Sequence, residues 1–394
     1  MTKRPLLSLT MLAAVLAAAP AHADFRDCVG SLRSAALSSG VSAETFDSAM
    51  QGVTAEPKVL ELADNQPEFK TPIWDYLATL TDDEKIADGR AAMARYAQAL
   101  ASAEQRFGVD RYAIAAVWGV ESDFGKATGK WYLPQALSTL VCHGSRRRDY
   151  FKGEFLATLK IIERGDLDPA ELKGSWAGAF GQTQFMPSTY LRLAVDGDGD
   201  GRRNLVSSVP DALASTANYL AKAGWQHGVP WGYEVQVPEH YSGPSGRTGK
   251  HPVSFWEGKG IRKIGGGGLS GSGAAGLLMP AGRNGPAFLV FKNYDAAYSY
   301  NGADSYALAI SILSDRLRGR PGIQADWPTD DPGLTRDERR ELQRLLRARG
   351  YDVGEPDGAV GQKTRDAISA IEQSIGLPPR GRPGMKVLQA LRGR

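Results

Sequence analysis

Residues 24–222 repeat apolar side chains at the three- and four-residue spacing of helices, and this long stretch constrains the fold most. Glycines stand directly after several of the periodic segments, where a left-handed cap commonly ends a helix. We therefore expect this half of the chain to form a helical domain. The clearest segments are 90–107, 111–121, 150–164 and 211–224, with Gly108, Gly165 and Gly224 as caps.

The composition changes over residues 228–301, where Gly and Pro become frequent. Short runs at 233–237 and 287–291 are typical of strands. Residues 265–268 predict a turn and not a phosphate loop, because no Lys-Ser/Thr pair follows them. A helix is expected again at 304–318. The predicted fold class is mainly α (α+β), a helical domain with a small β-containing insertion.

The N-terminus has the order of a secretory signal peptide. Lys3 and Arg4 precede an apolar run at 6–19 and an Ala-x-Ala end, so we expect residues 1–23 to be removed on export to the periplasm. A membrane anchor is the alternative, but the run is short for a bilayer. No Cys stands at the cleavage point, so we expect no lipid anchor.

Charge and length limit the class of protein. Without Lys3 and Arg4 the formal net charge falls from +3 to +1 (3 − 2), which argues against a nucleic-acid partner. A sequence pI near 8.7 is compatible with an anionic polymer. A chain of 394 residues predicts two or three domains. After signal removal we expect a monomer without a transmembrane segment.

The chain has two cysteines, Cys28 and Cys142. In an oxidising compartment such a pair indicates a disulfide that would tie the N-terminal segment to the helical domain. Two buried thiols are the alternative, and the sequence does not decide between them.

The C-terminal segment has its own pattern. Residues 321–332 are rich in Pro and Asp and predict a linker. Thr335 and Glu338 form a capping box that opens a helix. We expect a separate three-helix bundle over 333–394, and because it carries no catalytic or metal-binding constellation, we expect it to bind a ligand. Its other helices are predicted at 364–375 and 384–391.

Glu121 is the sharpest candidate for chemistry. With Ile114, Val117 and Trp118 it shares one helical stripe, so its carboxylate lies on the apolar face. Removal from water raises the pKa of a carboxyl group, as a general acid at neutral pH requires. The alternative is a helix-terminal Glu that reaches solvent. Motifs of serine, zinc and cysteine hydrolases are absent from the sequence, which leaves acid–base work to carboxylates.

Residues 175–188 form a Gly-rich stretch in which a ligand could approach the backbone closely. Ser175 and Gln184 offer hydrogen bonds to hydroxyl and acetamido groups, and Trp176 and Phe185 could pack against sugar faces. The alternative is a Gly-rich loop with core aromatics.

An acidic loop at 196–202 matches the start of an EF-hand, with oxygen ligands at alternate positions and Gly at the sixth. The closing Glu is missing, because Ser207 stands at position twelve. We expect a structural Ca²⁺ as one interpretation and a solvated acidic turn as the other. The ligands would be Asp196, Asp198 and Asp200, with Asp211 as a late carboxylate.

In this order the motifs resemble the lytic transglycosylase B family of murein enzymes. They are residues 118–122 (WGVES), 175–188, the loop at 196–204, 217–220 and 299–301, and the resemblance covers about 24–318. The tail resembles the three-helix peptidoglycan-binding domain. The resemblance implies a lysozyme-like catalytic domain at 24–320, a linker at 321–332 and a wall-binding domain at 333–394.

The resemblance also implies chemistry. Glu121 would protonate the glycosidic oxygen between N-acetylmuramic acid and N-acetylglucosamine. It would then deprotonate the C6 hydroxyl of the same muramic sugar, which attacks C1 and gives a 1,6-anhydro end. No second carboxylate and no cofactor is required, in contrast to two-carboxylate glycosidases. Peptidoglycan is the expected partner. The implied sugar contacts are Ser175, Gln184, Tyr219, Tyr300 and Asn301, and Arg146 and Arg147 would contact the glycan or its stem peptide.

The sequence departs from the family pattern in three ways. Gln182 and Thr183 stand where the family often has Gly-Tyr, the acidic loop is one residue longer before Asp211, and the lipid-anchor signal is missing. Two other functions stay open. One is a hydrolytic muramidase of the same fold, and the other is a wall-binding scaffold without activity.

Overall fold

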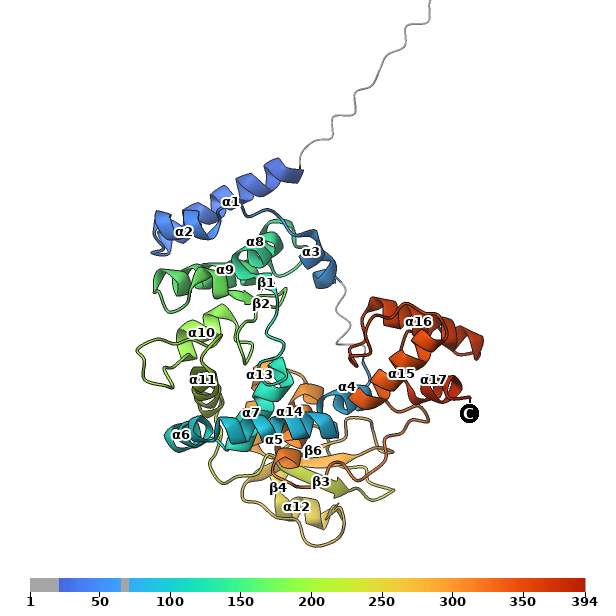
Figure 1. Cartoon of the computed structure of the whole chain (residues 1–394). Coiled ribbons are helices and arrows are strands. Elements are labelled where there is room, and N and C mark those ends of the chain that lie inside the picture. Colours follow the sequence, from blue (N-terminus) through green and yellow to red (C-terminus); the bar gives the residue numbers. More distant parts are fainter. Residues whose placement is uncertain (1–20, 65–70, 394) are drawn as a thin grey trace, which may run out of the picture.

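The computed structural model describes residues 21–64 and 71–393, which form two helical bodies, a five-stranded sheet and a C-terminal bundle (Figure 1). This architecture confirms the predicted α+β fold class with its mainly helical content. Most of the predicted signal peptide lies outside the described residues, and helix α1 begins at Ala21, within the last three residues of that segment. None of the described helices has the length and apolar character needed to cross a bilayer.

The first helical body joins the start of the chain to a later segment. Cys28 on α1 and Cys142 on α8 form a disulfide across 114 residues of sequence, with their Cα atoms 5.8 Å apart. Phe25 stacks on His143 beside it, at 5.6 Å between ring centroids. The body therefore forms only when both segments come together. It consists of α1 (Ala21–Ser38), α2 (Ala43–Ala49), α3 (Pro57–Asp64), α8 (Leu133–His143), α9 (Arg148–Glu163) and α10 (Pro187–Leu193), with the short strands β1 (Trp131–Tyr132) and β2 (Lys173–Gly174).

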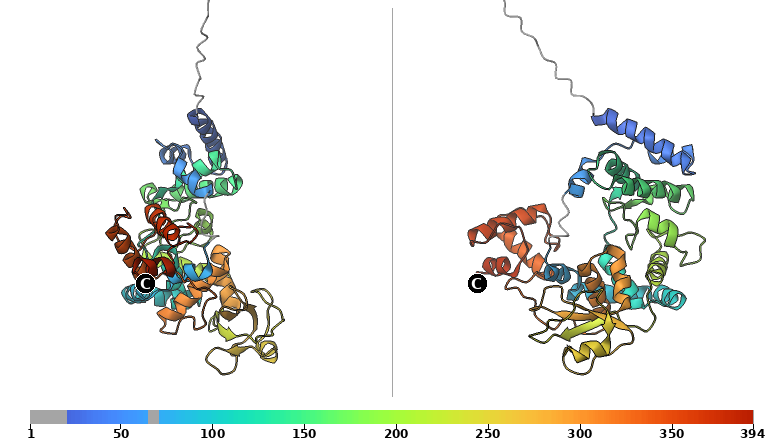
Figure 2. Two further views of the ribbon diagram at one scale, coloured as in Figure 1. Left: turned by 90° about the vertical axis from the view of Figure 1, so that its right-hand side faces the viewer. Right: turned by 180° about the vertical axis from the view of Figure 1, so that it is seen from behind.

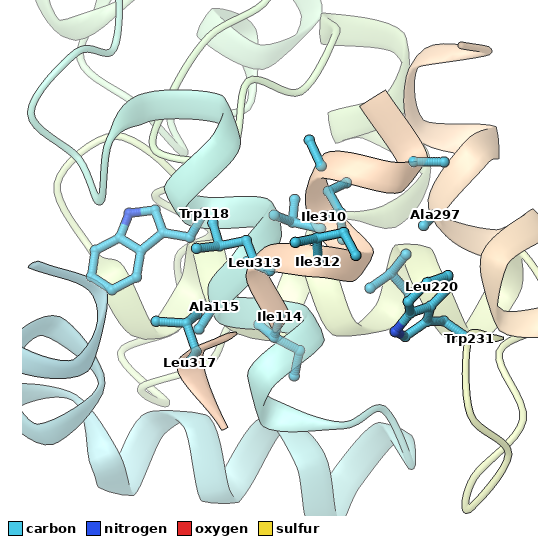
Figure 3. Packing of buried hydrophobic residues seen from close by; sticks show 14 of the residues in the cluster. Ile114, Ala115, Trp118, Leu220, Trp231, Ala297, Ile310, Ile312, Leu313 and Leu317 are labelled. Carbon is cyan, nitrogen blue, oxygen red and sulfur yellow. The ribbon is translucent and has the colours of Figure 1, made fainter. Parts of the chain in front are cut away.

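The second helical body is built around α7. Every residue from Ala113 to Gly119 is buried, so this helix has no solvent face over two turns. Figure 3 shows Ala115 and Trp118 of α7 facing Leu313 and Leu317 of α14. The helices of this body are α4 (Ile73–Leu80), α5 (Asp83–Arg95), α6 (Ala97–Phe107), α7 (Arg111–Ser122), α11 (Val209–Lys222), α13 (Lys292–Asn301) and α14 (Asp304–Leu317).

The helix predicted at 90–107 is wrong as a single element. It is the end of α5 and the whole of α6, separated by Tyr96, whose φ of −110° and ψ of 30° leave the helical region. The Tyr96 ring packs edge-on against Trp118 at 5.6 Å between centroids. Apolar spacing continues through such a bend, so periodicity alone does not reveal it.

The sheet has the strand order β4-β6-β7-β3-β5, with every pair antiparallel. The two predicted strands are confirmed as neighbours, β3 (Gly232–Gln236) and β7 (Ala287–Val290), with Tyr233 opposite Leu289. The chain passes from β7 directly into α13 and α14, so the sheet fixes where those helices start. The remaining elements are β4 (His251–Pro252), α12 (Val253–Gly258), β5 (Arg262–Lys263) and β6 (Ala274–Leu278).

The C-terminal bundle has its own core, centred on Leu342, Leu346, Ile368 and Leu388. The predicted capping box is confirmed, because the Thr335 hydroxyl accepts from the Glu338 N–H while the Glu338 carboxylate accepts from the Thr335 N–H. The bundle contacts α4 through Thr79 and Asp75 and α5 through Glu84. Figure 2 shows the bundle in red at the side of the molecule, near the C-terminus. Its helices are α15 (Arg336–Ala348), α16 (Gln362–Ser374) and α17 (Met385–Leu391).

The predicted linker is packed along the second helical body and the sheet. The backbone N–H groups of Gln324 and Ala325 donate to the Glu234 carboxylate on β3, each at 2.8 Å. The Trp327 ring lies 6.2 Å from that of Trp74 on α4. These contacts hold the segment in place on its way to the bundle.

Candidate functional site

Glu121 stands in the last turn of α7, partly buried, with its carboxylate at the end of an otherwise apolar helix. The Tyr306 hydroxyl, in the first turn of α14, donates a hydrogen bond to Glu121 Oε1. Burial raises the pKa of Glu121 to about 8, although the Tyr306 hydrogen bond acts in the opposite direction. The carboxyl group is therefore mostly protonated at neutral pH, which is the state of a general acid.

The segment after Glu121 has unusual backbone geometry. Asp123 and Phe124 have φ values of 53° and 58°, in the left-handed region that costs a non-glycine residue about 1–3 kcal/mol. The Phe124 ring fills the space between Gly89 and Gly119, where a Cβ would lie 2.6 and 2.5 Å from its Cζ atom. Glycine at both positions therefore lets the chain turn sharply directly after the carboxylate.

The Gly-rich loop forms a wall of the site. Gln184 has a positive φ of 49°, and its side-chain amide donates to the carbonyls of Thr128 and Gly181, both at 2.9 Å. Both donors are used within the protein, so only the carbonyl oxygen of Gln184 is left to accept from a ligand. The Ser175 hydroxyl accepts from the Ala179 N–H at 3.0 Å. Ser175 and Gln184 thus shape the loop in addition to any ligand contact.

The expectation that Phe185 stacks on a sugar is wrong, because the side chain is 2% exposed. Its ring lies 6.0 Å from those of both Tyr219 and Tyr300. Phe185 instead packs edge-on against the rings of these two tyrosines in the interior of the protein. Trp176, the other aromatic residue proposed from the sequence, is partly buried against the core of the first helical body.

Three tyrosines lie between Phe185 and Glu121. They are Tyr219, Tyr300 and Tyr306. Tyr219 and Tyr300 lie 4.6 Å apart between ring centroids, and Tyr300 stacks parallel to Tyr306 at 6.2 Å. The Tyr219 hydroxyl donates to the Ser299 carbonyl and the Tyr300 hydroxyl to the Thr183 carbonyl, each at 2.7 Å. Burial, reinforced by the negative charge of Glu121, holds the pKa of Tyr300 and of Tyr306 above its usual range. Both hydroxyls thus remain protonated and act as donors.

The other predicted sugar-contacting residues lie at the exposed surface. Asn301 is exposed at the end of α13, one residue beyond Tyr300. Arg146 and Arg147 are exposed between α8 and α9, where the Arg147 guanidinium lies over the Tyr150 ring at 4.1 Å. Over the described residues, no hydrogen bond or ion pair joins these arginines to Glu121.

Sequence reasoning missed Tyr306 and the role of Gln182. The Gln182 side-chain oxygen accepts from Trp118 Nε1 at 2.9 Å, and its backbone carbonyl accepts from the Ser122 hydroxyl at 2.5 Å. Gln182 therefore connects the Gly-rich loop to Trp118 and Ser122, which precede and follow Glu121 on α7. Its departure from the family pattern was a signal. Tyr306 offered none, because 185 residues separate it from Glu121.

The acidic loop brings together carboxylate oxygens of Asp196, Asp198 and Asp211, all within 4.8 Å of one another. Asp200 is not a member of this group, and its Oδ1 accepts from the Arg202 N–H at 2.7 Å. Asp211 is buried at the start of α11, and burial raises its pKa. Oxygen donors from three carboxylates are the ligand type that Ca²⁺ takes, so the residues fit this ion.

A cavity of about 680 Å³ lies at the opposite end of α7, beside Asp110. It does not include Glu121. Arg318 and Arg320 at its edge form ion pairs with Asp110 and Asp315, so these charges are already compensated. The Glu121 end of the helix is therefore the candidate site.

Comparison with known proteins identifies the family of the chain. A family model described as "Transglycosylase SLT domain" matches residues 24–315. The chain belongs to this transglycosylase family. A second model, for a peptidoglycan binding domain, matches residues 335–391. The resemblance inferred from the sequence motifs is thereby confirmed.

Individual relatives support this membership. The membrane-bound lytic murein transglycosylase B of Escherichia coli K12 is 38% identical over 179 residues, which are 43% of this chain and 49% of that protein. The match thus spans about half the length of this curated relative.

Solved structures of transglycosylases are similar over more of the chain. SltB3 from Pseudomonas aeruginosa in complex with NAG-anhNAM-pentapeptide has a TM-score of 0.76 at 42% identity, covering 93% of this chain and 99% of that one. Slt35 from E. coli in complex with calcium has a TM-score of 0.64 at 29% identity, covering 76% and 93%. The lysozyme-like fold expected from the motifs is therefore shown.

Proposed function

We propose that this transglycosylase cleaves the MurNAc-β-1,4-GlcNAc bond of peptidoglycan without water, leaving 1,6-anhydro-MurNAc ends. The observation that carries the proposal is Glu121, a carboxyl group with a pKa of about 8. Over the described residues, its hydrogen-bond partner is a tyrosine and no other carboxylate contributes to its pKa shift. A lone acid suits a reaction in which the substrate supplies the nucleophile.

The reaction uses one carboxyl group twice, first as an acid and then as a base. Protonated Glu121 gives its proton to the glycosidic oxygen as the C1–O bond breaks and the GlcNAc hydroxyl leaves. The resulting carboxylate takes the proton of the muramic C6 hydroxyl while that oxygen bonds to C1. The Tyr306 hydrogen bond stabilises the carboxylate between the two steps, and the acetamido group of the substrate stabilises the positive charge at C1.

The remaining side chains of the site would orient the glycan. Tyr219 and Tyr300 form an aromatic wall, and Tyr300 stacks on Tyr306, the hydrogen-bond partner of Glu121. We assign sugar contacts to these two residues and to Ser175, Gln184 and Asn301. The exposed Arg146 and Arg147 are assigned to the more distant glycan or stem peptide.

For the rest of the chain we propose the division drawn from the sequence, with a signal peptide at 1–23, a catalytic domain at 24–320, a linker at 321–332 and a wall-binding domain at 333–394. The protein would act as a periplasmic monomer in cell-wall turnover or remodelling.

Product analysis tests the reaction. Mass spectrometry of digested sacculi should find muropeptides with anhydro ends, each lighter than a hydrolysis product by one water. Reducing ends alone would favour the muramidase. Binding to sacculi without any soluble product would favour the inactive scaffold.

We further propose that Asp196, Asp198 and Asp211 hold a structural Ca²⁺. Calcium at about 100 times its Kd should then stabilise the fold by ~2.7 kcal/mol, measured as a calcium-dependent rise in melting temperature. Asp198→Asn should lose this rise. Asp200→Asn is the matched control, since the residue lies in the same loop but outside the three-carboxylate group, and it should keep the rise. An equal response of both variants and the wild type would contradict the site.

A further inference from the structure

The C-terminal bundle is connected to the catalytic helix by a chain of ion pairs. Arg336 is the first residue of α15, and its guanidinium donates to Asp123 Oδ1 at 3.2 Å and to Glu84 Oε1 at 3.2 Å. Asp123 is the C-terminal cap of α7, two residues after Glu121. A residue of the bundle thus contacts the turn that directly follows the carboxylate.

A second cation, the buried Lys85, also contacts Asp123. Lys85 on α5 is only 4% exposed at its side chain, and its ammonium donates to Asp123 Oδ1 at 2.7 Å and to the Gly119 carbonyl at 2.9 Å. Burial alone would raise the pKa of Asp123, but Lys85 and Arg336 together hold it below its usual range. Asp123 is therefore an anion held between a buried cation and a cation of the bundle.

The same contact also aligns two helix starts. Asp82 caps α5 by accepting from the Lys85 N–H at 2.8 Å, and its other oxygen accepts from the Arg336 N–H at 3.1 Å. Docking of α15 therefore sets the position of Arg336 relative to α5, and through Lys85 relative to the last turn of α7.

The ion pairs of Asp123 matter because they hold the turn after Glu121 in an unusual backbone conformation. Asp123 and Phe124 occupy the left-handed region, and such a conformation persists only where surrounding contacts fix it. With side-chain exposures of 15% and 22%, Arg336 and Asp123 lie where an ion pair is screened less than at the open surface.

We propose that Arg336 is a positioning residue, through which the docked wall-binding bundle holds the end of α7 and with it Glu121 in the orientation for cleavage. The proposal rests on the proposed function and deepens it, because it assigns the bundle a part in catalysis besides binding the wall. The orientation of the Glu121 carboxyl group would then depend on whether the bundle is docked.

The chain offers a matched control. Arg340 lies one turn further along α15 and also pairs with Glu84 across the same interface, but among the described contacts it does not reach Asp123. Arg336→Gln and Arg340→Gln each remove one interface cation, and only the first removes a partner of Asp123, which keeps its pair with Lys85. Arg336→Lys keeps a charge next to Asp123.

Turnover of soluble glycan fragments by the full-length protein tests the proposal. We expect Arg336→Gln to lower kcat about tenfold with KM changed less than twofold, as for a small misplacement of a catalytic group. Arg340→Gln should keep wild-type kcat, and Arg336→Lys should recover most of the loss. Equal losses in both glutamine variants, or a change in KM alone, would overturn the proposal. Wild-type turnover reports separately on the proposed function.

Two further measurements separate positioning from general destabilisation. Asp123→Asn can keep the left-handed backbone and should lower kcat at least as much as Arg336→Gln does, because it removes the charge that pairs with both Arg336 and Lys85. Arg336→Gln should cause no further loss in the Asp123→Asn background. Amide hydrogen exchange at residues 119–124 should become faster in Arg336→Gln and not in Arg340→Gln. Additive losses, or unchanged exchange in that segment, would contradict the link.

Discussion

Glu121→Gln is expected to lower the rate of glycan cleavage by about 10³-fold or more, since general acid–base catalysis contributes about 10²–10⁴ and one group serves both steps. The amide is close in shape to the protonated acid, but it can neither give a proton to the glycosidic oxygen nor take one from the C6 hydroxyl. Release of soluble anhydro products from sacculi measures the loss. Cleavage at the wild-type rate would remove Glu121 from the mechanism.

Tyr306→Phe is the control that keeps the acid and removes its partner. The Tyr306 hydrogen bond lowers the pKa of Glu121, so its removal should raise that pKa and move the alkaline limb of the activity profile to higher pH. The rate at neutral pH should fall by about ten- to a hundredfold, because a hydrogen bond to a charged group is worth ~1.5–3 kcal/mol. A limb that moves to lower pH would show that the hydroxyl does not stabilise the carboxylate.

Glu121→Gln should also stabilise the folded protein against unfolding as the pH rises. The folded pKa of about 8 exceeds the ordinary value of 4.5. Between these two pH values the unfolded chain releases a proton that the folded chain keeps, so wild-type stability declines as pH rises. Glutamine does not ionise, and the melting temperature of Glu121→Gln should exceed that of the wild type increasingly over this window. Equal melting temperatures at pH 9 would mean that burial does not raise this pKa.

Local patterns predicted the elements whose signals lie within a few residues. Strands β3 and β7, the capping box at Thr335 and the helix that carries Glu121 depend on spacing that is visible in one segment. The argument for Glu121 used an apolar stripe, although α7 is buried on all sides over residues 113–119. Its position in the last turn of the helix, and not the stripe alone, distinguishes Glu121 from the fully buried residues before it.

Contacts between distant segments could not be predicted in this way. Tyr306 reaches Glu121 across 185 residues, and Arg336 reaches Asp123 across 213. Neither residue stands out in its own segment, because a tyrosine in a first helical turn and an arginine after a capping residue are ordinary there. The sequence therefore indicated a separate bundle with a linker, whereas the structure packs the linker against the sheet and the bundle against the second helical body.

The disulfide has the largest expected effect on stability. Cys28→Ala/Cys142→Ala should lower the free energy of unfolding by about 3–5 kcal/mol, because a link across 114 residues removes much conformational freedom from the unfolded chain. Alanine is preferred to serine, since Cys142 is only 8% exposed and a hydroxyl there would be buried without an assured partner. Chemical denaturation in oxidising buffer measures the difference.

The location of the bond predicts how the loss is distributed. Cys28 and Cys142 join α1 to α8 in the first helical body, whereas Glu121 and Tyr306 belong to the second. Hydrogen exchange should therefore accelerate in α1 and α2 before α7, and cleavage at low temperature should persist. Reductant should destabilise the wild type to the level of the double variant and leave that variant unchanged. If the two proteins unfold within about 1 kcal/mol of each other without reductant, well below the usual 2–5 kcal/mol, the link contributes little to this fold.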